Sequence, residues 1–580
     1  MSFYDAIRVG ASGAADFEVK RSLRFNSGDS TYLQNTPSSA GNRKTNTLSF
    51  WVKLGKSGIS DSGTVASCNS SNSNANNISV VIRTGSVRIV GYYNNFRITN
   101  RILRDPSAWY HIVVAIDTTQ GSADNRIKLY VNGVQETSFS TSGSVGQNDD
   151  LGFAQAATTR IGSRSNDGNG SYFDGYIAEV NFIDGQALTP SSFAETNSDT
   201  GQWVPIDTSG LTFGTTGFYV KFADNSGTTA TTLGKDSSGN GNNFTPNNFS
   251  VSAGIDGDSF ADTPTNNFCT LNPLVRSTNA AQSLSDGNLT RSGSSHKCVG
   301  TFVLKNNKYY FEVKVEDGNG NAGIGVTQAD TDFRTRDNTE AAAYFTNGEY
   351  KIEGSGQTSG FSTYGNGDII GVAIDTTLST PKVWFSKNNT WQGTGDPSTT
   401  GYSLTAGKDY VFNVDHGSNS STTTATAFFG AHMGEFNYTP PTGFVAASSA
   451  NLPDPTILLP NKHFDTDLYT GTGSSLSRSA FNFQPDWLWF KSRSASGHNH
   501  ALFDSVRGRA VGLSSDQTYS EFTSSASNDL VSFDNDGFTL GGNQNFASVN
   551  GSGTKVAWAW NGGDTDGKTY TVTVVSDSGN

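Results

Sequence analysis

One stretch, from Trp109 to Gly133, limits most strongly what this chain can fold into. Residues 111–116 form a β-branched, apolar run, and after a polar loop residues 127–132 alternate between apolar and polar side chains. Alternation with a period of two places one set of side chains on the buried face of a strand and the other in solvent. Asn132-Gly133 then supplies the positive φ angles that a tight hairpin turn needs. The stretch therefore predicts antiparallel sheet and not helix.

The composition extends this interpretation to the whole chain. Of 580 residues, 65 are Gly and 15 are Pro, while 11% are aromatic and only 16% are charged. Abundant turn residues with many aromatic side chains are typical of β proteins, and the low charge argues against disorder. Since one hydrophobic core rarely serves more than ~250 residues, the length predicts several domains. We expect an all-β protein.

Charge and hydropathy exclude two classes of partner. The net charge is −13, from 52 acidic and 39 basic residues, and no basic cluster with interleaved aromatics occurs. Nucleic-acid binding needs such clusters to contact phosphates. No run approaches the ~20 apolar residues of a membrane helix, and the first residues lack the apolar centre of a signal peptide. We expect no nucleic acid, no membrane insertion and no secretory route.

The three cysteines do not suggest a disulfide framework. Cys68, Cys269 and Cys298 are odd in number and widely spaced, unlike disulfide or zinc patterns. Cys269 and Cys298 could form a bridge, but buried free thiols are the favoured alternative. A large chain without disulfides is expected to fold in a reducing cytosol.

The opening hairpin lies within a longer pattern of strands. Strand-like segments precede it at 22–33 and 47–52, and FDGYIAEVNFIDGQAL follows at 173–188. A Trp-x-His strand, an Asp and a Leu-Tyr-Val-Asn-Gly hairpin in this order resemble the concanavalin A-like, laminin-G-type jelly roll. The resemblance implies a β-sandwich over residues 21–203, with binding surfaces in the loops at its ends.

Residues 274–449 carry a second set of motifs. YYFEVKV, AGIGV, DIIGVAI and PKVWFS follow one another and resemble the SPRY domain. Asn388-Asn389 stands where that family usually has Asn-Gly, a small departure that leaves the implied fold unchanged. The SPRY domain is itself a concanavalin-like sandwich used for protein binding. The resemblance therefore implies interaction and not catalysis.

Four further segments complete the expected organisation. Residues 1–20 form a leader, either an anchor that docks on a larger assembly or a frayed end or extra edge strand. Residues 204–273 form an ordered connector rich in turn-forming Asp, Ser, Gly and Asn. Residues 450–563 predict a smaller C-terminal β domain, and 564–580 begin a further strand or domain. The expected architecture is tandem antiparallel jelly-roll sandwiches followed by this smaller domain.

Phrases along the whole chain carry one more resemblance. SLRFNSGDSTYLQNTPSSAGNRKT, DSSGNGNNFTPNNF, PDWLWFKSR and FDNDGFTLG resemble the fibre or receptor-binding proteins of tailed bacteriophages, particularly marine ones. The resemblance implies a virion protein that is assembled in the host cytoplasm and exposed on the released particle. It also implies docking on other virion proteins through the leader and, by analogy, a homotrimer.

Catalytic residues are not evident. Glycan hydrolysis needs two carboxylates ~5–9 Å apart across the bond, but Glu179 is alone on its strand, with Asp174 and Asp184 near turns. His498 and His500 are spaced for metal binding, yet no third ligand or nucleophile is suggested by spacing. We expect no enzymatic activity.

Exposed aromatic side chains are candidate platforms for sugars. Tyr92, Tyr93 and Phe96 lie in GYYNNFRITN, and Trp391 lies in NNTWQGTGD. The alternative for each is a place in a hydrophobic core, where most aromatic residues of this chain are expected. These four are the candidate glycan-binding residues.

Calcium is the one cofactor considered. Asp317 begins a loop of calcium-binding type, but Gln328 stands at its twelfth position instead of a bidentate acid, and Asp236 begins a similar loop. Both are better explained as turns. The laminin-G-type resemblance implies a calcium site at a loop end, with Asp167 and Asn169 as weak candidates. Otherwise we expect no cofactor.

Three functions are consistent with these patterns. The first is a non-catalytic fibre or adhesin whose sandwiches recognise a host-surface glycan or protein. The second is a structural spacer, or a capsid or tail decoration, without a receptor. The third and least favoured is a glycan depolymerase, which would require a cleft with paired carboxylates. The sequence favours the first.

Overall fold

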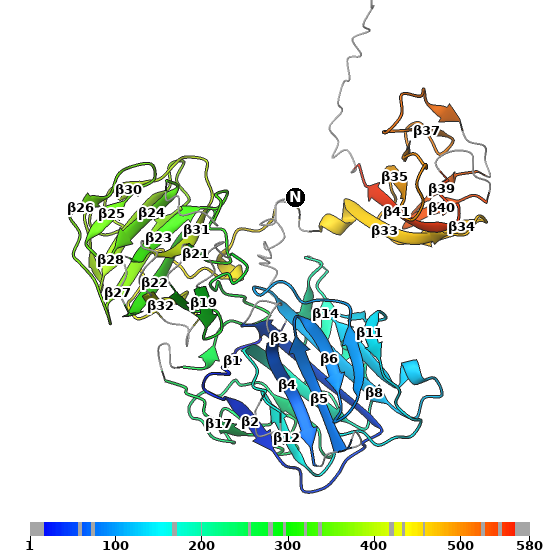
Figure 1. Ribbon diagram of the computed structural model, residues 1–580, viewed down its shortest axis with the longest axis horizontal. Coiled ribbons are helices and arrows are strands. Elements are labelled where there is room, and N and C mark those ends of the chain that lie inside the picture. Colours follow the sequence, from blue (N-terminus) through cyan, green and yellow to red (C-terminus); the bar gives the residue numbers. More distant parts are fainter. Residues whose placement is uncertain are drawn as a thin grey trace, which may run out of the picture. The chain divides into compact units, whose positions relative to one another are not determined.

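The computed structural model describes residues 17–562 apart from 56–60, 71–72, 74–75, 165–170, 199, 253–256, 276–281, 294–296, 318–321, 334–338, 417–422, 432–435, 456, 458, 524–527 and 543–547. It divides into two compact units: residues up to Pro455 without 199–201, and the remainder. The all-β class is confirmed (Figure 1). The described part contains short 3-10 helices of three residues, η3 (Ala123–Asn125), η4 (Pro190–Ser192), η5 (Ser449–Asn451) and η6 (Pro460–Lys462).

Two eight-stranded antiparallel sheets form the first sandwich. One runs in the order β10 (Val134–Gln135), β9 (Ile127–Val131), β8 (Trp109–Asp117), β3 (Thr45–Leu54), β13 (Gly175–Asp184), β1 (Ser22–Phe25) and β18 (Ser259–Phe260), with β16 (Phe218–Val220) beside β13. The other runs in the order β11 (Phe139–Ser142), β7 (Asn95–Thr99), β6 (Ser86–Val90), β5 (Asn77–Arg83), β4 (Asp61–Asn69), β12 (Thr158–Ile161), β2 (Tyr32–Asn35) and β17 (Thr245–Asn247).

The predicted hairpin is present. Asn132 and Gly133 both have positive φ, 49° and 80°, and join β9 to β10 in register. Strand β8 is buried on both faces, because one face packs in the sandwich core and Val113 and Ala115 pack on the other side against Phe193 and Phe213. Burial on two faces explains why residues 111–116 are almost continuously apolar.

The segment 204–273 is built into the first sandwich. Its strands β16, β17 and β18 pair with β13, β2 and β1 respectively. Asp236, in its DSSGNGNNF motif, accepts hydrogen bonds from the backbone N–H groups of Tyr219, Ser238 and Asn242. This carboxylate therefore stabilises a turn, as the sequence indicated. A separate two-stranded sheet joins β14 (Ala194–Thr196) to β15 (Trp203–Pro205).

The second sandwich also consists of two antiparallel sheets. The larger has the order β19 (Gln282–Ser285), β20 (Thr290–Gly293), β32 (Thr423–Phe428), β22 (Lys308–Asp317), β27 (Ile369–Asp375), β28 (Lys382–Lys387) and β29 (Thr390–Trp391), with β30 (Tyr402–Ser403) beside β28. The smaller has the order β21 (Cys298–Val299), β31 (Tyr410–His416), β23 (Ala322–Gln328), β24 (Ala341–Phe345), β25 (Glu349–Lys351) and β26 (Thr358–Ser359).

One hydrophobic cluster extends across both sandwiches. Trp51, Trp109 and Tyr176 of the first sandwich belong to the same buried cluster as Phe311 and Phe412 of the second. Polar contacts cross the same boundary, since the Tyr176 hydroxyl donates to the Gly287 carbonyl at 2.9 Å. Apolar side chains that would be surface residues in an isolated sandwich are therefore removed from water.

The C-terminal unit is a smaller pair of sheets. Six strands have the order β33 (Phe464–Gly471), β41 (Gly553–Trp560), β35 (Trp487–Ser492), β36 (Ala501–Asp504), β37 (Val511–Leu513) and β38 (Phe522–Thr523), and three have the order β34 (Leu476–Ser479), β40 (Gly537–Leu540) and β39 (Leu530–Asp534). Leu488, Phe490, Phe503 and Phe538 form its core. The side chains of Trp487 and Trp489 alternate with these and are half-buried.

Several expectations concern chain ends, thiols and membranes. Most of the predicted leader and all of residues 564–580 lie outside the described residues. Cys68, Cys269 and Cys298 are buried free thiols, as expected. Within the described ranges, no helix has the length and hydropathy needed to cross a membrane.

Candidate functional site

A cleft of about 280 Å³ opens where the first sandwich meets residues that lead into the second. We call it the inter-sandwich cleft. Its walls combine aromatic rings with short polar side chains, namely Trp51, Asp105, Ser107, Ala108, Trp109, Asn132, Gln202, Trp203, Pro264, Thr265, Asn267, Phe302 and Ser449. This volume is slightly below the ~300–1,000 Å³ typical of small-molecule sites. An apolar cavity of about 20 Å³ between the sheets of the first sandwich is far smaller.

A buried histidine positions one wall of the cleft. The Trp203 indole N–H donates to Nδ1 of His111 at 3.0 Å, and Nε2 of His111 lies 2.8 Å from the Ser49 hydroxyl. The Trp51 ring stacks on the imidazole with centroids 4.8 Å apart. Burial lowers the pKa of His111 to about 3, so the ring is neutral at physiological pH. Because Nδ1 accepts, the proton resides on Nε2.

The Asn-Gly turn of the hairpin supports the same wall. A Cβ added at Gly133 would lie 2.9 Å from the Trp203 ring, closer than real contacts allow. The Asn132 side-chain oxygen accepts the backbone N–H of His111 at 2.8 Å. The turn therefore reverses the chain and also provides the space in which Trp203 packs.

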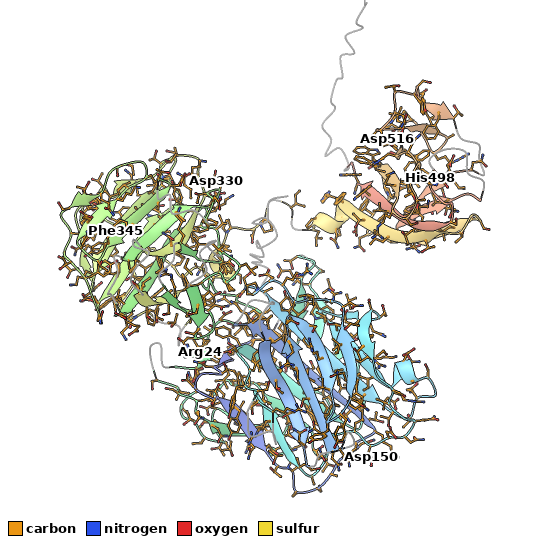
Figure 2. All side chains as sticks on the ribbon, in the orientation of Figure 1. Arg24, Asp150, Asp330, Phe345, His498 and Asp516 are labelled. Atoms are coloured by element: carbon orange, nitrogen blue, oxygen red, sulfur yellow. The ribbon has the colours of Figure 1, made fainter. Side chains whose placement is uncertain are left out.

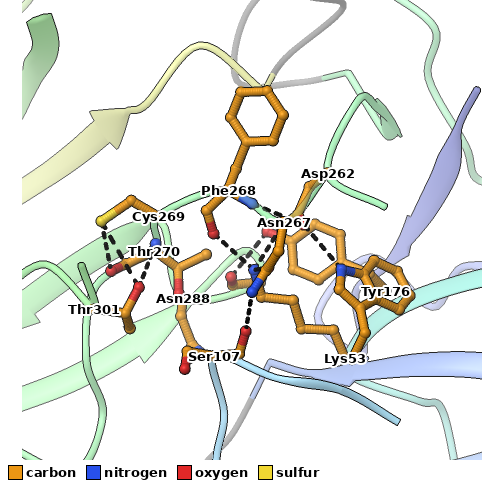
Figure 3. Close-up of polar contacts among 12 residues, drawn as sticks. Lys53, Ser107, Tyr176, Asp262, Asn267, Phe268, Cys269, Thr270, Asn288 and Thr301 are labelled. Carbon is orange, nitrogen blue, oxygen red and sulfur yellow. Dashed lines mark hydrogen bonds and ion pairs between the residues drawn. The ribbon is translucent and has the colours of Figure 1, made fainter. Parts of the chain in front are cut away.

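A buried ion pair holds the opposite wall (Figure 3). Nζ of Lys53 donates to Asp262 Oδ2 at 2.7 Å, to Asn267 Oδ1 at 2.7 Å and to the Phe268 carbonyl at 2.8 Å. The second oxygen of Asp262 accepts the Trp109 indole N–H at 3.0 Å. All three ammonium donors are used. The charges of Lys53 and Asp262 offset each other within this pair.

The residues proposed from sequence lie elsewhere. Tyr92 and Tyr93 occupy the turn between β6 and β7, are 38% and 76% exposed, and contact each other edge to face at 4.4 Å. Trp391 is on the other sandwich, half-buried against the cluster of Trp384 and Phe444. Asp167 and Asn169 lie outside the described residues. The structure does not gather these candidates into one site.

Phe96 requires a correction. Its side chain is only 2% exposed and belongs to the core of the first sandwich. It follows the exposed turn closely, but its position on β7 directs the ring inward. Phe96 cannot present a ring face to a sugar in solvent.

The carboxylates weighed for catalysis have structural partners. Asp184 accepts the backbone N–H groups of Asn42 and Thr216, and Asp174 accepts that of Ser27. Glu179 is buried, accepts the Tyr219 hydroxyl and has a φ of 51° at an irregularity in the β13–β3 register. Burial raises the pKa of Glu179 to about 7.

Glu179 gives stability a pH dependence of defined sign. Its folded pKa of about 7 exceeds the ordinary value of 4.5, so the folded state retains a proton that the unfolded state releases. The free energy of unfolding should therefore fall as pH rises from 4.5 to 7, by at most about 3 kcal/mol. The variant Glu179→Gln should not show this decline. Urea unfolding of both proteins between pH 5 and about pH 8 measures the difference. Equal slopes in both proteins would contradict the assignment.

The two histidines of the C-terminal unit also have local partners. His500 Nδ1 accepts the Trp489 indole N–H at 2.6 Å, and the His498 carbonyl accepts Nζ of Lys491 at 2.6 Å. Figure 2 marks His498 with Asp516, whose carboxylate accepts the backbone N–H of His500. Among the residues described, no group of three or more His, Cys, Asp or Glu side chains is arranged to hold a metal ion.

Three family models match separate parts of the chain. The concanavalin A-like lectin/glucanases superfamily matches residues 26–194, the SPRY domain matches 308–400, and a domain of unknown function (DUF7483) matches 459–579. The domain content predicted from the sequence, a concanavalin A-like domain followed by a SPRY domain, is confirmed. The comparison with curated proteins gives no match.

Solved structures show similarity to parts of the chain. The SPRY domain of human HERC1 is 17% identical, with 25% of this chain and 91% of that chain covered and a TM-score of 0.20. A heptameric SAP-like pentraxin from Limulus polyphemus is 18% identical, with 30% and 80% covered and a TM-score of 0.23. A human SPRY domain is 17% identical, with 25% and 94% covered and a TM-score of 0.20.

Proposed function

We propose that this protein is a non-catalytic fibre or adhesin of a tailed-bacteriophage virion, which binds a host-surface glycan in the inter-sandwich cleft. The observation that carries the proposal is the cleft itself, with its volume of about 280 Å³ and its mixed aromatic and polar walls. Concave sites of this kind, in which a few polar groups fix the orientation of a ligand on apolar walls, are typical of small-molecule recognition.

The lining groups suit a sugar ring. A sugar has C–H faces that pack on aromatic rings and hydroxyls that need hydrogen-bonding partners. Trp203 and Trp109 supply rings, and Asn132, Thr265 and Ser449 supply amide and hydroxyl groups. Removing the apolar faces from water favours binding, while the polar groups select the orientation.

The virion context rests on the resemblance of sequence phrases along the chain to tailed-phage fibre proteins. We propose that the protein is exposed on the released particle, docks on other virion proteins through its leader and is a homotrimer. Light scattering tests the oligomeric state, and a monodisperse monomer would contradict it. We further propose that binding needs no cofactor, so a chelator added to the binding assay should have no effect.

Replacing Trp203 with Ala is expected to weaken glycan binding by roughly tenfold or more, because an aromatic anchor of ~1.4 kcal/mol or more is lost. The assay measures retention of the purified protein on intact host cells and on their extracted polysaccharide. Tyr93→Ala is the matched control, since it removes an exposed ring at a different site. Loss of binding in Tyr93→Ala alone would move the site to the turn between β6 and β7.

The same assay separates the alternative functions. Release of oligosaccharides by the wild-type protein would identify a glycan depolymerase and contradict the non-catalytic proposal. Neither retention nor release would favour a structural spacer or decoration protein without a receptor.

A further inference from the structure

The inter-sandwich cleft has an unequal distribution of charge. Among the described residues that line it, Asp105 is the one with a charged side chain. Arg104, its neighbour in sequence, is exposed and does not line the cleft. A ligand in the cleft therefore meets the Asp105 carboxylate, and no cationic side chain among the described lining residues offsets its charge.

The nearest buried cation cannot compensate this charge. Lys53 is fully buried, and its three ammonium donors are used by Asp262, Asn267 and the Phe268 carbonyl. An anionic ligand would gain no hydrogen bond from Lys53 unless one of these contacts were broken. Breaking such a buried contact is costly.

The indole groups also offer few donors to an anion. The Trp109 N–H is used by Asp262 and the Trp203 N–H by neutral His111. These two side chains therefore contribute aromatic surface, whose faces carry partial negative charge and attract cations. The Asp105 carboxylate and the indole faces therefore both favour a cationic ligand.

The Asp105 carboxylate is held in place before any ligand binds. Its Oδ1 accepts both the backbone N–H of Ser107 at 2.8 Å and the Ser107 hydroxyl at 2.6 Å. Among the described residues, no side chain or backbone group hydrogen-bonds to Oδ2. Ser107 is itself buried, so it fixes the carboxylate at the cleft wall.

We propose that the cleft selects amino-sugar units that carry a free ammonium group, with Asp105 as the specificity-determining residue. This inference rests on the proposed function of glycan binding in the cleft. The sugar ring packs on the aromatic walls, and its ammonium group pairs with the Asp105 carboxylate. Acidic sugars are disfavoured because their carboxylate would face Asp105.

The test compares three defined probes by calorimetry at low salt: glucosamine oligomers, the same oligomers N-acetylated, and oligogalacturonate. We expect glucosamine oligomers to bind at least about fivefold more tightly than their N-acetylated form, because N-acetylation removes the charge. Oligogalacturonate should bind most weakly. High salt should reduce the preference by screening the pair.

Asp105→Asn should reduce the preference for the charged form to less than about twofold while retaining the N-acetylated oligomer. Asp150→Asn is the matched control, since Asp150 is exposed on the same sandwich and does not line the cleft (Figure 2). It removes the same charge and should keep the wild-type preference.

The outcomes separate the two proposals. Equal binding of the charged and N-acetylated oligomers would overturn the inference, as would a preference that is unchanged in Asp105→Asn. The proposed glycan site would still stand in either case if Trp203→Ala weakens binding. If Trp203→Ala leaves the binding of every probe unchanged, the cleft is not the glycan site and both proposals fall.

Discussion

Replacing Lys53 with Met is expected to lower the free energy of unfolding of the first unit by about 3–5 kcal/mol, because it leaves the buried Asp262 carboxylate without its cation. Lys53 and Asp262 are 0% and 2% exposed, with Nζ and Oδ2 2.7 Å apart. The effect is measured as a shift in the denaturant midpoint of urea or guanidinium unfolding, with the m-value unchanged.

Two further variants test the reason for this loss. The double variant Lys53→Met with Asp262→Leu should recover part of the stability, since apolar pairs often replace buried ion pairs at little cost. Lys408→Met removes the exposed pair with Asp330, marked in Figure 2, and should leave the midpoint unchanged. If Lys53→Met has no greater effect than Lys408→Met, the ion pair does not stabilise the first unit.

Acid is expected to destabilise the first unit through His111. The folded pKa of about 3 lies below the ordinary 6.5, so the unfolded state binds a proton that the folded state excludes. The stabilisation is fully present above pH 6.5 and is lost as pH falls towards 3, by at most about 5 kcal/mol at ~1.4 kcal/mol per pH unit.

The variant His111→Gln isolates this effect. It removes the titrating group, and its amide oxygen can still accept the Trp203 indole N–H. Unfolding midpoints of the two proteins from pH 7 to about pH 5 should converge as wild type loses its advantage, before most carboxylates titrate. Parallel pH dependences would contradict a neutral, buried His111. Glycan binding in the cleft should stay unchanged in the same range, since folded His111 remains neutral and still accepts the Trp203 indole N–H.

Local patterns were sufficient to predict the sandwiches. The alternation at residues 127–132 and the Asn132-Gly133 turn depend on neighbours in sequence, and both are present in the structure. The predicted SPRY motifs correspond to strands β22, β23, β27 and β28. In each case, backbone geometry and alternate burial act within a few residues.

The cleft could not be predicted in this way, because it depends on contacts between distant residues. Trp109 and Asp262 are 153 positions apart, and Lys53 and Phe268 are 215 apart. In TLSFWVKL, Lys53 has the pattern of a solvated position, but its ammonium group contacts residues 209 to 215 positions away. Phe96 was misassigned for the opposite reason, since a one-residue change of register reverses the face of a side chain.

The core shared by the two sandwiches determines which parts of this gene can be exchanged by recombination. A junction between residues 204 and 261 would separate Lys53 from Asp262 and split the cluster in which Trp109 and Tyr176 contact the second sandwich. A junction near Pro455, where the contacts divide, cuts no described core. We therefore expect the two sandwiches to be inherited together, whereas a junction near Pro455 leaves their shared cluster intact.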